Sequence, residues 1–229
     1  MISKVNENIM ISGKVLPDSS YRTVWNGNSI IPMMSGRKTS LTVSSESAND
    51  SISGSGARTV LVEGLNASLE MIAIEVEMNG QSPVDIGDLF AHVNSAMVLT
   101  TGSTGYNEDV IHVGTGTVTS GVPSTSYEQI PVRDGISHTV RYVVPKGKIF
   151  HVKRVALSRL TDKSFLVDMK KYYNGSWITM NSFAFETGDR CHVYDSPLVI
   201  PSGHAFAMEV SNDAGAGEMI YAKVFGEEK

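Results

Sequence analysis

Two glutamates stand two positions apart in the segment MIAIEVEMNG, residues 71–80. In a β-strand, Glu75 and Glu77 would share one face, with their side chains about 7 Å apart. A pair of carboxylates near that separation can hydrolyse a glycosidic bond, one acting as the acid and the other as nucleophile or base. Acids on the outer face of a strand are also typical of a solvated surface that discourages unwanted strand pairing. We favour the second interpretation, which makes both residues solvent-facing or partner-facing acids.

The thiol and imidazole groups are too dispersed to predict a metal site or a nucleophile. Cys191 is the single cysteine, and no two of the six histidines stand at H-x-H or H-x₃-H spacing. Structural zinc needs four such ligands, often in closely spaced pairs. His192 follows Cys191 directly, but neighbours in a strand point to opposite faces and do not form a dyad.

The glycine-rich segment GTGTVTSG, residues 114–121, does not have the spacing of a phosphate-binding loop. It lacks the G-x-G-x-x-G pattern and is not followed by a helix whose N-terminus could hold a phosphate. No G-x-S-x-G nucleophile elbow occurs either. We therefore expect no cofactor and no enzymatic activity, with a polysaccharide depolymerase as the weakest alternative.

Basic residues gather in the second half of the chain, where residues 141–171 hold nine Lys or Arg and two Asp. The predicted contact surface consists of Arg141, Lys146, Lys148, Lys153, Arg154, Arg159, Lys170 and Lys171. Such a strip could be solvated, or it could bind nucleic acid with help from Tyr172, Tyr173 and Trp177. Because the first half is acidic, we favour protein contact over nucleic acid: the basic half of one copy would meet the acidic half of another, Glu75 and Glu77 included.

The elements that carry these residues are predicted to be β-strands throughout. Ile72, Ile74, Val76 and Met78 alternate with polar residues, which indicates a strand with one buried face. Together with residues 59–63, this strand predicts a hairpin, and Asn79-Gly80 is a turn signal at its end. In the second half, Phe165, Val167 and Met169 share a face, as do Phe206, Met208 and Val210. No long helix is predicted.

We predict an all-β fold of two domains, each resembling a β-sandwich or jelly roll. Residues 1–55 form an irregular arm or loose strands, residues 56–125 the first β-domain, and residues 126–229 a jelly-roll-like sandwich. Apolar residues of the arm could dock on a partner, namely Met10, Trp25, Met33 and Met34. Ordinary core filling is the alternative, and we favour it for the methionines as a group.

Two sequence features fit folding in a cytoplasm. The first residues, MISKVNENIMISGKV, lack the apolar core of a signal peptide, and no segment is apolar enough for a membrane span. A chain with one cysteine can form no internal disulfide.

Several segments resemble virion structural proteins of tailed bacteriophages. GARTVLVEGLNASLEMIAIEVEMNG is similar to a strand–turn–strand segment of that family, although Met78 and the residues after Gly80 depart from its pattern. SHTVRYVVPKGKIFHVKRVALS and SPLVIPSG are similar to two later strand–turn motifs of the family. The resemblance covers about residues 53–226.

The resemblance implies a non-enzymatic structural component of the virion, assembled in the cytoplasm of a bacterial host. The chain would dock on the capsid, neck or tail as a decoration or accessory protein. Its partners would be other copies of itself, with a trimer as one option, and the major capsid, neck or tail proteins. We expect neither nucleic acid nor a membrane as partner. The alternative is a receptor-binding or glycan-binding module of a tail fibre, with Tyr172, Tyr173, Asn174 and Trp177 as the candidate ligand contacts.

Overall fold

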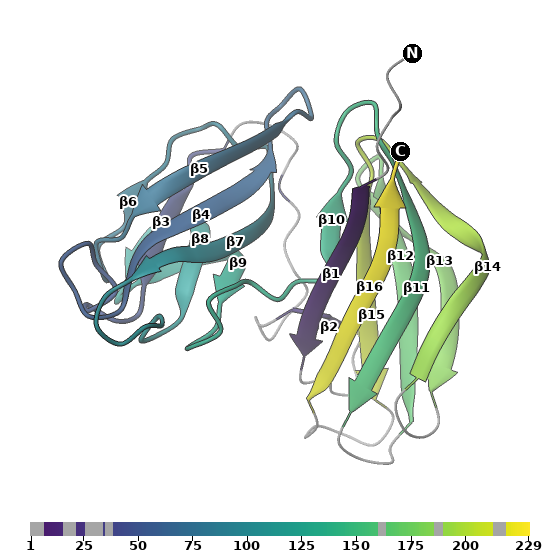
Figure 1. Ribbon diagram of the computed structural model, residues 1–229. Coiled ribbons are helices and arrows are strands. Elements are labelled where there is room, and N and C mark those ends of the chain that lie inside the picture. The colour runs from purple at the N-terminus through teal and green to yellow at the C-terminus, as the bar shows by residue number, and fades with distance from the viewer. Residues whose placement is uncertain are drawn as a thin grey trace. The chain divides into compact units, whose positions relative to one another are not determined.

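The computed structural model describes residues 7–15, 22–25, 34, 39–159, 164–185, 190–212 and 219–229. The elements within these residues are sixteen β-strands and no helix, which Figure 1 shows in sequence colours. The predicted all-β class is therefore confirmed. No helix in the described part of the chain is long and apolar enough to cross a membrane.

The chain divides into two compact units whose boundaries differ from those predicted. Unit 1 combines Met1–Ile30 with Thr139–Lys229, and unit 2 is Ile31–His138. Strand β1 (Glu7–Val15) pairs along its full length with β16 (Ile220–Glu228), so the start of the chain belongs with its end. Strand β9 (Val122–Ile130) runs through position 125, where the sequence had suggested a boundary. Pairing between distant segments leaves no local signal, which is why alternation alone misplaced both boundaries.

Unit 1 contains two antiparallel sheets. The first has the order β1-β16-β11-β14, in which β11 is Ile149–Arg159 and β14 is Arg190–Pro201. The second has the order β10-β15-β12-β13, with β10 Arg141–Val143, β15 Ala205–Asn212, β12 Phe165–Tyr173 and β13 Ser176–Phe185. The short strand β2 (Arg22–Thr23) also pairs with β15. From β10 to β16, apart from the β12–β13 hairpin, strands that follow one another alternate between the two sheets.

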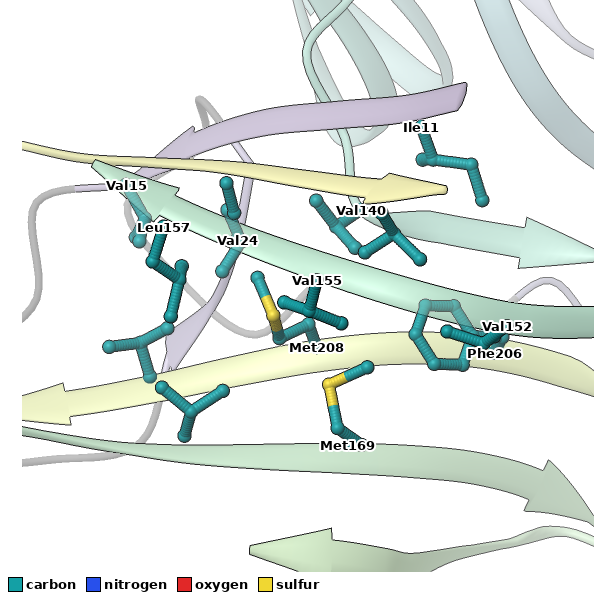
Figure 2. Packing of buried hydrophobic residues seen from close by; sticks show 14 of the residues in the cluster. Ile11, Val15, Val24, Val140, Val152, Val155, Leu157, Met169, Phe206 and Met208 are labelled. Atoms are coloured by element: carbon teal, nitrogen blue, oxygen red, sulfur yellow. The ribbon is translucent and has the colours of Figure 1, made fainter. Parts of the chain in front are cut away.

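Both sheets of unit 1 contribute side chains to one hydrophobic core. Figure 2 shows Val152 and Val155 of β11 in the same cluster as Met169 of β12 and Phe206 and Met208 of β15. The predicted apolar faces are confirmed, because their residues are all buried. They are Phe165, Val167 and Met169 on β12, and Phe206, Met208 and Val210 on β15. This core fixes which face of each sheet turns outward.

Unit 2 has a separate core between two further sheets. One sheet has the order β6-β3-β8-β9, with β6 Val84–Asp85, β3 Thr42–Ser45 and β8 Ile111–Thr119. The other has the order β5-β4-β7, with β5 Met71–Glu77, β4 Ala57–Leu65 and β7 His92–Thr101. Val43, Val62, Val76 and Ile111 come from strands of both sheets and meet in one cluster.

The predicted hairpin is the β4–β5 pair. Its connection is closed by Asn66, whose side-chain oxygen accepts hydrogen bonds from the backbone N–H groups of Ser68 at 2.8 Å and Glu70 at 3.0 Å. Leu69 takes the left-handed conformation there, with φ 62°. Ile72, Ile74 and Val76 pack toward the unit 2 core, as their alternation predicts.

Candidate interaction surfaces

The outer face of the β1-β16-β11-β14 sheet carries cations beside exposed apolar side chains. Because the inward positions of these strands fill the core, the residues between them point outward. We call this surface the basic face and define it as Met10, Lys14, Lys153, Arg154, Val193, Asp195, Val199, Tyr221, Lys223, Phe225, Glu227 and Lys229. Figure 1 shows its four strands side by side.

One cross-strand row forms the apolar centre of the basic face. Strand register places Met10 opposite Phe225, Phe225 opposite Arg154, and Arg154 opposite Val193. Met10 is 59% exposed and Val193 is 63% exposed. The Arg154 guanidinium lies 3.9 Å from the centre of the Phe225 ring, a cation–π contact that orients the charge. The row therefore presents apolar contact area around a fixed cation.

The basic face contains two carboxylates, Glu227 and the exposed Asp195. The Glu227 side chain accepts hydrogen bonds from Lys153 Nζ at 2.6 Å and from Lys229 Nζ at 2.8 Å. These two bonds lower the pKa of Glu227 to about 2. Lys14, Arg154 and Lys223 add further positive charge, so the face is basic.

The remaining members of the predicted basic strip lie in other places. Lys170 forms an ion pair with Glu209 on β15, and Lys148 Nζ lies 3.9 Å from a carboxylate oxygen of Glu228. Arg141 is buried, at 2% exposure, and so is not a surface residue of the chain. The sequence misplaced Arg141 because the residues next to it do not indicate that β10 pairs with β15.

The other three residues of the predicted contact surface are Lys146, Lys171 and Arg159. Lys146 is exposed in the turn before β11, and Lys171 is half-buried near the end of β12. The side chain of Arg159 lies outside the described residues. Only Lys153 and Arg154 of the predicted contact surface are therefore placed together on the basic face.

Unit 2 presents a surface of opposite charge on the outer side of its β5-β4-β7 sheet. We call it the acidic face and define it as Leu61, Glu63, Met71, Ala73, Glu75, Glu77, Ser95, Met97 and Thr100. Register places Leu61 opposite both Glu75 and Met97. Glu75 and Glu77 are exposed, as predicted, and Met71 is 54% exposed. Strand β5 lies at the edge of this sheet.

The predicted docking arm is only partly at the surface. Met10 is exposed on β1, whereas Trp25 at 3% and Met34 at 4% exposure are buried within the chain. Burial leaves these two side chains no area with which to dock on a partner. Met33 lies outside the described residues.

The turn between β12 and β13 carries a cluster of aromatic rings. The Tyr172 and Trp177 rings lie 5.2 Å apart, and Tyr173 stacks on His204 with 4.3 Å between ring centres and 9° between planes. Burial, followed by the nearby charge of Lys171, lowers the pKa of His204. The sequence could not place His204 here, because the pairing of β12 with β15 brings it from a distant turn.

Comparisons with known proteins give little similarity. No protein-family model matches the sequence, and no curated protein matches it. A structure of the infectious bursal disease virus Gx strain is 9% identical, with a TM-score of 0.24, over 97% of this chain and 69% of that chain. A structure of the Gt strain is 11% identical, with a TM-score of 0.22, over 100% and 72%. At these TM-scores the similarity carries no argument about fold or function.

Proposed function

We propose that this chain is a non-enzymatic structural component of a tailed-phage virion, which docks as a homo-oligomer on the capsid, neck or tail. The observation that carries the proposal is the basic face, where exposed Met10 and Val193 flank a cation on a four-stranded sheet. Exposed apolar area rimmed by charge is typical of surfaces that bind other proteins. The resemblance of residues 53–226 to tailed-phage virion proteins is the reason for assigning the chain to a phage particle.

The proposal includes a fold for each unit: a jelly roll for unit 1 and a second β-sandwich for unit 2. The two strand orders β1-β16-β11-β14 and β10-β15-β12-β13 support the jelly roll, because a jelly roll winds eight strands into two four-stranded sheets. The two-residue strand β2 adds a fifth strand to the second sheet. On this view, unit 2 is an insertion in the connection between β2 and β10. Jelly rolls form many viral capsid domains.

The experiment that tests this function is the analysis of purified phage particles. We expect mass spectrometry to find the chain in particles banded on a density gradient, in many copies relative to a tail-tip protein. Particles free of the chain, made by cells that express it, would contradict the proposal.

The stacked pair of Tyr173 and His204 favours a second candidate, which is the binding of a host glycan at this end of unit 1. Aromatic faces beside a lysine suit the apolar face of a sugar and an acidic substituent. Binding on a glycan array that a Tyr173→Ala variant loses would support it. No binding, with the chain recovered in purified heads, would decide against it.

A further inference from the structure

We infer that the basic face of one copy binds the acidic face of a second copy, so that the chain associates head to tail. The inference rests on the proposed structural function and names the partner of the surface. Each copy carries one face of each kind, on different units. Such a heterologous contact repeats from copy to copy and closes into a ring or continues as a filament.

The charges of the two faces are complementary. The basic face holds five cations (Lys14, Lys153, Arg154, Lys223 and Lys229) and two carboxylates, Asp195 and Glu227. The acidic face holds Glu63, Glu75 and Glu77, and none of its defined positions is Lys or Arg. Complementary surfaces steer encounter and fix the register of a complex. A second copy satisfies both faces at once, whereas nucleic acid would leave the acidic face without a partner.

The spacing of the carboxylates on the acidic face also matches the spacing of two cations on the basic face. Glu75 and Glu77 are neighbours on one side of β5, about 7 Å apart. Arg154 is opposite Phe225, two residues from Lys223 on β16, so Arg154 and Lys223 are diagonal neighbours. Diagonal neighbours in a sheet are about 7–8 Å apart. Two cations can therefore meet two carboxylates at one relative position of the sheets.

Apolar residues occupy matching positions beside these charges. Met97 and Leu61 stand in the same cross-strand row as Glu75. Met10 and Val193 stand in the row of Arg154. When the charges pair, these side chains can meet between the sheets, as the inner faces of packed sheets do at a separation of about 10 Å. The apolar area supplies affinity, and the charges supply orientation.

The inference is tested by exchanging the charges between two forms of the chain. One form carries Glu75→Lys and Glu77→Lys, and the other carries Arg154→Glu and Lys223→Glu. Sedimentation velocity over a range of concentrations measures association of each form and of their equal mixture. We expect the unchanged chain to self-associate, and each form alone to associate at least about tenfold more weakly, because like charges then meet. The mixture should recover association, since each form supplies the complement of the other.

A control variant carries Glu70→Lys and Asp88→Lys, which alter the net charge as much as the changes on β5 but lie outside the acidic face. It should associate like the unchanged chain. If the Arg154 substitution prevents folding, as judged by circular dichroism, Lys223→Glu alone replaces that form in the mixture.

Three results would overturn the inference: a chain that stays monomeric, a mixture that recovers nothing, or a control variant that is weakened equally. Binding of a DNA fragment that needs Arg154 and Lys223, without recovery in the mixture, would also overturn it and would assign the face to nucleic acid. Finding the chain in purified particles alongside any of these results would leave the proposed function standing. If the chain is absent from particles but the mixture recovers association, the proposed function is wrong and the contact between copies still stands.

Discussion

At the residue scale, Asp50 is a buried polar side chain that joins several segments of unit 2. Its buried carboxylate accepts hydrogen bonds from Ser45 Oγ at 2.6 Å and from the backbone N–H groups of Ala57 at 2.7 Å, Glu108 at 2.9 Å and Asp109 at 3.2 Å. One side chain thus joins the segment before β4 to the segment before β8. In the sequence, Asp50 sits in a Ser-rich stretch that indicates only a loop.

Replacing Asp50 with alanine should therefore destabilise unit 2 strongly. The change leaves the buried Ala57 N–H and the part-buried N–H groups of Glu108 and Asp109 without this acceptor, and a buried group left unpaired costs about 1–3 kcal/mol. We expect urea denaturation to show a loss of at least about 3 kcal/mol in the free energy of unfolding of unit 2. Asp88→Ala, at an exposed position, is the control and should change it little. Equal stability of the two variants would contradict the role of Asp50.

Glu227 should make the stability of the fold depend on pH, because its pKa falls from the ordinary value of 4.5 to about 2 in the folded chain. Because the folded state binds the proton less readily than the unfolded state, the ionised side chain stabilises the fold above pH 4.5. That stabilisation is lost as the pH falls toward 2. Thermal melts should show the unchanged chain to be more stable than Glu227→Gln at pH 6, with the difference shrinking between pH 4.5 and 2. A difference that stays constant with pH would refute the lowered pKa.

At the element scale, β1 is a strand of the unit 1 sheet and not a free arm. Its Ile11 and Val15 are buried, and Gly13 lies where a Cβ atom would come within 2.6 Å of the Val24 carbonyl oxygen and 2.9 Å of a Val140 methyl group. The sequence run IMISGKV does alternate, but nothing local tells that its partner is β16, at the other end of the chain.

Gly13→Val should therefore destabilise unit 1, because its side chain needs space that backbone and core atoms fill. Overpacking of this kind costs about 1–3 kcal/mol. Urea denaturation followed by the near-ultraviolet signal of unit 1 would measure it. Ser12→Val, one residue away on the opposite face of β1, is the matched control. Equal losses from both changes would contradict the placement of β1.

Strand alternation predicts which face of a strand is buried, but not which strands become neighbours. Alternation placed Ile74 and Val76 inside and Glu75 outside, because burial on one face of a strand has a period of two residues. It could not show that Arg141 is buried or that His204 stacks on Tyr173. Both depend on which strands become neighbours, and strand pairing is not encoded in the spacing of a single segment.

At the scale of the whole molecule, the two units should fold independently. Each has its own core, and Trp25 forms a β-bridge with Thr139, so the chain leaves unit 1 and returns to it at neighbouring points. A chain with residues 31–138 replaced by a short Gly-Ser linker should therefore melt cooperatively. Residues 31–138 alone should do the same, as judged by circular dichroism and calorimetry. If either piece lacks a cooperative transition, the division into two units is wrong.

We expect the chain to be built into a phage particle through its sheet faces, and a cryo-EM map of particles that contain it would show these contacts. The map should contain repeated copies in which the β1-β16-β11-β14 face of one chain lies against the β5-β4-β7 face of the next. A map without density for the chain, or with the β1-β16-β11-β14 face in contact with solvent in every copy, would show that the chain is not held in this way.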